Sequence, residues 1–222
     1  MTDSPSEPQG SGGHDRLDQA FWDERYRSRP LLWSGRPNRQ LVAEVEGLPA
    51  GTALDVGAGE GADAIWLARR GWRVTAVDLS PVALERAGAH AAEAGPEVAG
   101  RIDWQQRDIL EWEPPAGRYD LVSTQYLHLP PALRRPFFER LAASVRPGGT
   151  LLVVGHHPSD LQTSVPRPPM PELFFTGEEV AAALDGPEWE VVVDAAVPYE
   201  VEDPDGRLVV VHDTVFRARR AH

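Results

Sequence analysis

The chain of 222 residues contains no cysteine, and it contains no lysine either, so all 22 of its basic side chains are arginine. The absence of cysteine excludes disulfides, thiolate metal sites and a thiol nucleophile. The absence of lysine excludes Schiff-base chemistry, a phosphate-binding P-loop and the Tyr-x-x-x-Lys pair of short-chain dehydrogenases. Covalent catalysis through sulfur or through a lysine amine is therefore ruled out.

Long apolar runs and strong basic patches are also missing. No apolar run reaches the length of a membrane span and no signal peptide is visible, which predicts a cytoplasmic protein without membrane contact. The net charge is −12. The densest groups of basic residues in the chain are short, at Arg134–Arg135 and Arg217–Arg220. Because phosphate neutralisation supplies much of the affinity for nucleic acids, we expect no nucleic-acid partner. No spacing of Asp, Glu and His supports a metal site, and the oligomeric state is left open.

Strands and helices alternate through the middle of the chain. The expected helices are 15–28, 38–48, 61–70, one that begins after the Ser80 cap, and 131–145. The expected strands are 53–56, 73–77, 102–105, 119–124 and, after a tight turn at 147–149, 150–154. This rhythm predicts an α/β fold with a doubly wound parallel sheet covered on both faces. Near the C-terminus a capping box at Thr176 and Glu179 opens a short helix, and strands 190–196 and 207–217 form an antiparallel hairpin.

The most informative segment is the glycine-rich turn that follows the first expected strand, TALDVGAGEG at 52–61. Glycine lets a backbone come close to a ligand, and the helix behind the turn offers free N–H groups. Asp78 ends the next strand, where a carboxylate can accept both hydroxyls of a ribose. An adenosine-type cofactor is therefore predicted. The loose dinucleotide fingerprint is satisfied as well, by Gly57, Gly59 and Ala62, so a nicotinamide cofactor stays open at this point.

Two further acids distinguish between these cofactors. Asp55 lies two residues before Gly57, where its carboxylate would meet a phosphate badly but an ammonium group well. Asp108 follows the third strand and could accept a hydrogen bond from an adenine amino group. With these acids the sequence resembles the class I S-adenosylmethionine (SAM)-dependent methyltransferases, whose pattern is Asp/Glu-x-Gly-x-Gly-x-Gly, an acid on the second strand and an Asp after the third. The resemblance runs from about Phe21 to the C-terminus.

The resemblance implies a Rossmann-like fold with a C-terminal antiparallel hairpin strand, an ending that argues against NAD. It implies SAM as cofactor, with a small molecule as methyl acceptor. The residues expected to hold SAM are Asp55, Gly57, Ala58, Gly59, Gly61, Asp78, Leu79, Asp108, Ile109 and Gln125. The expected organisation is a disordered leader at 1–14 and one domain at 15–222. That domain divides into a helical cap at 15–50, a cofactor-binding core at 51–155, and a substrate loop with the hairpin at 156–222.

Polar residues after the fourth strand lie where the family places the transferring methyl group. Nucleic-acid amino-group methylases carry Asn/Asp-Pro-Pro-Tyr/Phe there, whereas this chain has TQYL at 124–127, which argues against base methylation. A hydroxyl or ammonium nucleophile needs a general base. His128 and Tyr126 are the catalytic candidates, with His156 and His157 as second choices. A loop histidine without a catalytic role is the competing interpretation for His128.

The segment 31–38, LLWSGRPN, is similar to a segment that closes over the cofactor in methyltransferases of the thiopurine and tellurite-resistance type. Trp33 and Arg36 are therefore candidates for a lid, Trp33 with the cofactor. The alternative is a tryptophan that packs two helices together. The proline-rich segment 156–175 either shapes a substrate pocket or is a surface loop.

Two other classes of protein stay open. One is an NAD(P)-dependent oxidoreductase that uses the same glycine turn, although it would lack a lysine partner and a separate substrate domain. The other is a catalytically silent SAM-binding subunit or sensor.

Overall fold

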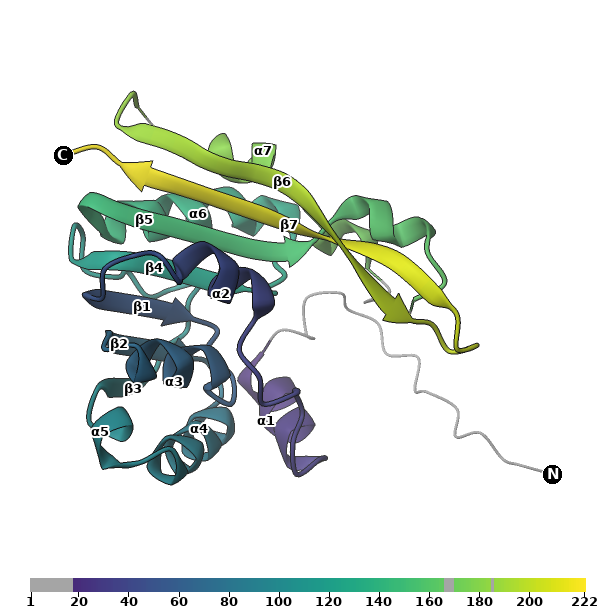
Figure 1. Cartoon of the computed structure of the whole chain (residues 1–222), viewed down its shortest axis with the longest axis horizontal. Coiled ribbons are helices and arrows are strands. Elements are labelled where there is room, and N and C mark those ends of the chain that lie inside the picture. The colour runs from purple at the N-terminus through teal and green to yellow at the C-terminus, as the bar shows by residue number, and fades with distance from the viewer. Residues whose placement is uncertain (1–17, 166–169, 185) are drawn as a thin grey trace.

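The computed structural model describes residues 18–165, 170–184 and 186–222. The expected leader at 1–14, residues 15–17 of the first expected helix, and the prolines at 166, 168 and 169 of the proline-rich segment lie outside the described residues. Within that part of the chain the strands form one sheet in the order β3-β2-β1-β4-β5-β7-β6, with helices on both faces (Figure 1). None of the helices in the described residues is long and apolar enough to cross a membrane.

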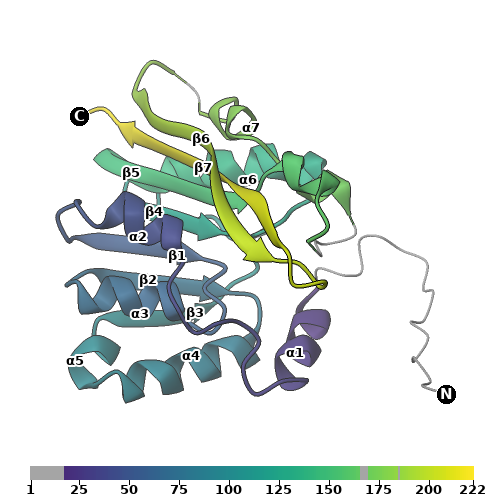
Figure 2. The same ribbon diagram turned by 45° about the vertical axis from the view of Figure 1, so that its right-hand side comes forward.

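The strands are parallel except at one edge. Their bounds are β1 Thr52–Val56, β2 Arg73–Asp78, β3 Ile102–Gln106, β4 Tyr119–Gln125, β5 Val145–His156, β6 Trp189–Glu202 and β7 Leu208–Arg220. Strand β7 pairs antiparallel with both β5 and β6, as the sequence predicted for the terminal hairpin. Both strands of the hairpin are longer than expected, and their far end projects beyond the rest of the sheet (Figures 1 and 2).

The helices follow the predicted order with shorter bounds. They are α1 Gln19–Arg27, α2 Arg39–Val45, α3 Ala62–Arg69, α4 Pro81–Glu93, α5 Pro96–Ala99, α6 Pro131–Ser144 and α7 Gly177–Ala181. The short helix α5 was not predicted. The Ser80 hydroxyl accepts from the Ala83 N–H with Pro81 in the first turn, as expected of that cap. The capping box of α7 is also confirmed.

Two apolar layers hold the sheet between its helices. Side chains alternate along a strand, so Leu54 of β1 belongs to the layer that contains Phe137 of α6. Its neighbour Ala53 belongs to the layer that contains Leu41 of α2 and Leu67 of α3. The central strands are therefore apolar on both faces, as a parallel sheet covered on both sides requires.

One expectation about local structure was wrong. The tight turn expected at 147–149 lies inside β5, which begins at Val145 and pairs with Tyr119 before the register shifts. Helix α1 buries Tyr26 together with the acid Asp23, while Trp22 is only partly covered. Asp23 is buried because its carboxylate accepts a hydrogen bond from the Ser80 hydroxyl at 2.5 Å, which ties α1 to the start of α4.

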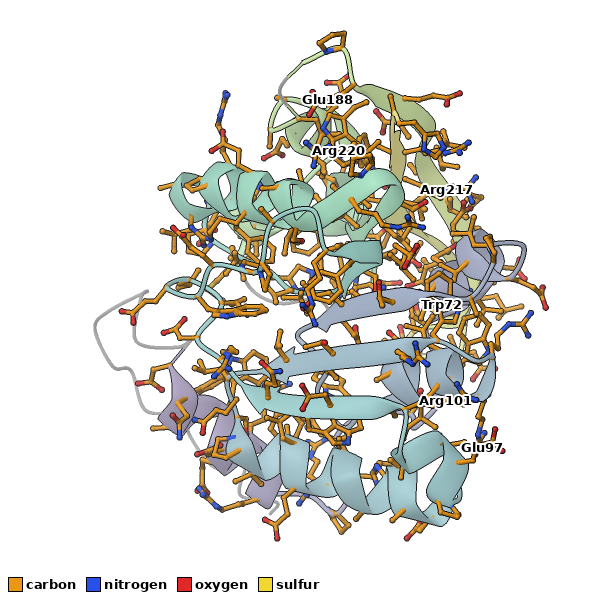
Figure 3. All side chains as sticks on the ribbon, turned by 90° about the vertical axis from the view of Figure 1, so that its left-hand side faces the viewer. Trp72, Glu97, Arg101, Glu188, Arg217 and Arg220 are labelled. Carbon is orange, nitrogen blue, oxygen red and sulfur yellow. The ribbon has the colours of Figure 1, made fainter. Side chains whose placement is uncertain are left out.

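The end of the sheet at which the parallel strands begin carries ion pairs. Figure 3 looks toward this side and labels both Glu97 with Arg101 and Glu188 with Arg220. Their shortest N–O distances are 3.2 and 3.1 Å. Exposed pairs of this kind contribute little to stability. The glycine turn and the acids singled out in the sequence lie at the opposite end.

Gly61 shows how tightly the glycine turn packs. Its φ is +86°, and a Cβ atom there would lie 2.6 Å from Trp104 and 2.9 Å from Ala87. We predict that Gly61→Ala lowers the free energy of unfolding by about 2–4 kcal/mol, the sum of left-handed strain and overpacking.

Urea unfolding measures this, with Gly117→Ala as the matched control. Gly117 also has a positive φ, +60°, but has open space around it. Gly117→Ala therefore introduces backbone strain alone, and it is expected to lower the free energy of unfolding by about 1–2 kcal/mol. Equal losses in the two variants would contradict the packing role of Gly61.

Candidate active site

The predicted site residues gather where β1, β2 and β4 end, which is where α/β folds bind ligands. Helix α1 and the segment 31–38 lie at this end of the sheet (Figures 1 and 2). The glycine turn leaves β1 here, Asp78 ends β2, and Gln125 ends β4. Parallel strands bring these three distant stretches of sequence to one edge, as the sequence predicted.

The backbone N–H groups of the glycine turn are used within the protein. Gly57 and Ala58 both donate to the Val77 carbonyl, at 2.9 and 3.0 Å. Gly59 donates to the Asp78 carboxylate, and Gly61 donates to the Ala58 carbonyl. These four N–H groups are therefore not available to a ligand in this structure. The expectation of free N–H groups concerned the helix behind the turn and stays a prediction.

Three acids surround the turn instead. Asp55 is buried, with 1% of its surface exposed. It accepts from the Ala64 N–H, while its Oδ2 atom has no hydrogen-bond partner. Burial raises the pKa of Asp55, and the nearby carboxylates of Asp63 and Asp78 raise it further. Burial also raises the pKa of Asp63 to about 6. This arrangement favours a ligand that brings positive charge.

Asp78 has two structural partners. One carboxylate oxygen accepts from the Gly59 N–H at 2.8 Å and the other accepts from the Ser80 N–H at 2.9 Å. Burial raises the pKa of Asp78. Each carboxylate oxygen can accept a further bond, so the structural role at the start of α4 and a role toward a ribose are compatible.

The candidate lid lies against the glycine turn. The Trp33 indole N–H donates to the Tyr26 hydroxyl at 3.2 Å, and both groups lie beside Gly59, where a Cβ atom would be 3.1 Å from that hydroxyl. Trp33 is 48% exposed, so it does not serve as a buried wedge between two helices. Arg36, the other lid candidate, is exposed at the surface.

Glu60 fastens this lid. Its carboxylate accepts from the backbone N–H groups of Leu32 and Trp33, at 3.0 and 3.1 Å, and pairs with Arg86 at 3.0 Å. Glu60 is buried and stands between the two last glycines of the motif. No role was predicted for Glu60, although an acid inside a glycine motif was a visible signal.

The remaining predicted cofactor residues lie along the β3 side of the site. Asp108 is exposed, and its carboxylate accepts from the Leu110 N–H at 2.9 Å, which shapes the turn after β3. The Ile109 carbonyl accepts from Arg140, and the Leu79 carbonyl accepts from Gln106. A role for them toward a cofactor stays a prediction.

The predicted catalytic candidates His128 and Tyr126 belong to a cluster of rings at the ends of β4 and β5. The rings of His128 and His156 stack at 4.9 Å between centroids, with 16° between their planes. Tyr126 lies 4.7 Å from His156, and Phe174 lies 5.8 Å from it. The first-choice base and one of the second choices are thus brought together.

His157 points elsewhere, toward Ser159 at 2.9 Å. Gln125 ends β4, and its side-chain amide nitrogen is buried without a hydrogen-bond partner. Burial raises the pKa of Tyr126, as does the adjacent Asp213 carboxylate. Its phenol therefore keeps its proton near neutral pH, and a role for Tyr126 as a general base is disfavoured.

Across the residues that the structure describes, no group of three His, Asp or Glu side chains could hold a metal ion.

Asp213 was not among the predicted site residues. It lies in strand β7, accepts from the Tyr126 hydroxyl, and is fully buried. The available signal was the one acid of this strand, since buried carboxylates need partners.

Comparisons with known proteins agree with this geometry. Residues 53–149 match the family model of the methyltransferase domain. A 2-heptyl-1-hydroxyquinolin-4(1H)-one methyltransferase of Mycobacteroides abscessus is 29% identical over 134 residues, 59% of this chain and 58% of that protein. A ubiquinone biosynthesis O-methyltransferase of Xanthomonas campestris pv. campestris is 32% identical over 139 residues, 62% of this chain and 56% of that protein. The chain thus spans little more than half the length of these relatives.

Solved structures share the fold. One was described with the conversion of a disulfide bond into a thioacetal group during echinomycin biosynthesis. It has a TM-score of 0.70 and 24% identity, and covers 91% of this chain and 92% of its own. The [4+2]-cyclase SpnF has a TM-score of 0.61 and 18% identity, and covers 82% of this chain and 78% of its own. The sheet order and the glycine turn are those of the Rossmann-like class I methyltransferase fold. Residues 53–149 of this fold are the part that matches the methyltransferase domain model.

The acids around the turn make the stability of the ligand-free protein depend on pH. The pKa of Asp63 is about 6 in the folded chain against an ordinary 3.8, so the folded state binds this proton more tightly than the unfolded state. The resulting stability is greatest below pH 3.8 and is lost as the pH rises to about 6. We predict that Asp63→Asn melts a few degrees above the wild type at pH 7, an advantage that shrinks toward pH 4.

Thermal melts across this pH range test the prediction. Asparagine keeps the acceptor for the Asn38 N–H, which binds Asp63 at 2.6 Å. The exposed Asp205→Asn variant controls for loss of one surface charge. A constant difference between Asp63→Asn and wild type at every pH would contradict the assignment.

Proposed function

We propose that this chain transfers a methyl group from SAM to a small-molecule acceptor. The observation that carries the proposal is the Asp55 carboxylate, which is buried with one unpartnered oxygen. It lies beside a turn in which the N–H groups of Gly57, Ala58, Gly59 and Gly61 are bound within the protein. SAM is an adenosine derivative with positive charge on its sulfonium and ammonium groups. It matches a site that combines a glycine turn with the three acids Asp55, Asp63 and Asp78.

The same geometry disfavours the NAD(P) alternative. A dinucleotide places a pyrophosphate at the glycine turn, where helix N–H groups receive it. Here the N–H groups of Gly57, Ala58 and Gly59 are occupied, and Asp55 would face the phosphate with a buried negative charge. Since like charges in a buried site repel strongly, a cationic ligand is the better occupant.

Several residues fit the cofactor. Asp55 would bind the amino group, and Asp78 would accept hydrogen bonds from the ribose hydroxyls. Gly57 and Gly59 would let the ligand come close to the backbone. Trp33 of the lid and Tyr26 of α1 would cover the site, with Asp108 and Ile109 beside the adenine. SAM supplies an activated methyl group, so the task of the protein is to align the acceptor with it and to exclude water.

The acceptor is proposed to be a small hydroxyl compound. Both curated relatives are named for small-molecule methylation, one on a hydroxyquinolinone and one as an O-methyltransferase. The ring cluster of His128, His156 and Phe174 offers stacking surface for a flat acceptor. His128 is proposed as the general base, with His156 stacked against it.

Binding of SAM is the first test. We predict that isothermal titration detects SAM and not NADH. Asp55→Asn, which removes only the charge, weakens SAM about 10- to 100-fold, the equivalent of about 1.5–3 kcal/mol for a charged hydrogen bond. Asp78→Ala abolishes binding, because it also removes the acceptor for the Gly59 N–H.

The exposed Asp205→Asn variant is the control and keeps wild-type affinity. Circular dichroism checks that each variant is folded. NADH binding without SAM binding would overturn the proposal in favour of a dinucleotide enzyme.

The second test concerns the acceptor and the base. Release of S-adenosylhomocysteine is measured with 2-heptyl-1-hydroxyquinolin-4(1H)-one, phenols, thiols and amines. For a phenol that is not ionised at the assay pH, His128→Gln is expected to lower kcat about 100-fold or more, as loss of a general base does. For 4-nitrophenol at a pH where it is already ionised, the loss is small.

His157→Gln is the matched control, because His157 points away from the ring cluster. An equal loss with ionised and neutral phenols would contradict the role of His128 as a base. Tight SAM binding with no turnover on any acceptor would favour the silent SAM-binding alternative.

A further inference from the structure

Tyr126 adopts a backbone conformation that few side chains tolerate. Its φ is +51°, and among the described residues it is the single non-glycine residue with a positive φ. This left-handed conformation costs about 1–2 kcal/mol. Strain of this kind persists where the surrounding structure enforces it, and it clusters at functional sites.

Hydrogen bonds hold Tyr126 in place from three sides. Its backbone N–H donates to the Val154 carbonyl of β5 at 2.9 Å. Its hydroxyl donates to Oδ1 of Asp213 at 2.8 Å and also hydrogen-bonds with the Tyr199 side chain. Asp213 is fully buried on β7, opposite His156 of β5 in the strand register. The C-terminal hairpin therefore reaches the loop that follows β4.

The same carboxylate binds the N-terminal part of the chain. Its Oδ2 accepts from the Gln40 side chain of α2 at 3.1 Å, and Tyr199 of β6 is a further hydrogen-bond partner. Helix α2 begins at the Asn38 cap, whose N–H donates to Asp63 behind the glycine turn. Asp213 thus lies in a continuous chain of contacts from the glycine turn to Tyr126.

The conformation of Tyr126 decides where its neighbours lie. Leu127 packs against the glycine turn, since a Cβ atom at Gly57 would lie 2.9 Å from its side chain. His128 then stacks on His156. An extended backbone at 126 would direct both side chains differently, because φ at this residue sets the path of the following chain.

We propose that Asp213 is a positioning residue for the methyl-transfer site. Through the Tyr126 hydroxyl it holds the left-handed backbone that sets His128 against His156 and Leu127 against the glycine turn. The functional part of this inference rests on the proposed function. The positional part concerns the ligand-free protein and is tested without SAM.

The test follows the histidine imidazole signals by NMR in the ligand-free protein. The chain has seven histidines, and the signals of His128 and His156 are assigned from their His→Gln variants. Tyr126→Phe, which removes only the hydroxyl, is expected to displace both signals by more than their line width. Tyr119→Phe makes the same change at the other end of β4 and leaves both signals in place.

A second pair of variants separates positioning from simple loss of stability. Asp213→Asn keeps an oxygen that can accept from the Tyr126 hydroxyl, so it retains the wild-type signals. Asp213→Leu removes the acceptor and displaces them. Unchanged signals in folded Tyr126→Phe, or equal displacement in the Asn and Leu variants, would overturn the proposal.

The transfer assay adds the functional readout. With an accepted phenol, Tyr126→Phe is expected to lower kcat about 10- to 100-fold while KM for SAM changes less than about threefold, as misalignment does. A parallel loss in SAM affinity would overturn the assignment of Tyr126 and Asp213 to the acceptor side of the site. If SAM does not bind at all, the proposed function fails while the NMR result still decides the position of Asp213.

Discussion

The buried carboxylate of Asp55 constrains the arrangement around it more than any other single group. Strand β1 places it under the turn, where the N–H groups of Gly57 and Ala58 are already bound to β2 and only one of its own oxygens has a partner. An ionised group buried in this way is costly unless a partner arrives. Burial and the neighbouring acids therefore raise the pKa of Asp55 in the ligand-free protein, and a cationic ligand would stabilise the ionised carboxylate.

Hydrogen bonds tie earlier parts of the chain to this region. Glu60 binds the segment with Trp33, and the Ser80 hydroxyl binds Asp23 of α1. Glu60 lies within the glycine motif and Ser80 lies two residues after Asp78, whereas both partners precede the motif in the sequence. A lid tied directly to the motif can respond when a ligand enters the turn, because the two share hydrogen bonds.

The C-terminal hairpin completes the site from the other side. Asp213 of β7 contacts Tyr126 after β4 and Gln40 of α2, so strands late in the chain help to set the loop where transfer is proposed to occur. The contacts of Asp213 that anchor the hairpin are therefore the same contacts that are proposed to shape the acceptor side.

The sequence alone determined the layered α/β fold, the antiparallel ending and the cofactor motif, because strand and helix periodicity, glycine spacing and caps such as Ser80 are local properties of the chain. Only the tertiary structure decided that the N–H groups of the turn bind Val77, that Glu60 fastens Trp33, and that Asp213 reaches Tyr126. These contacts join residues far apart in sequence. Their geometry depends on how the strands align, which no local pattern encodes.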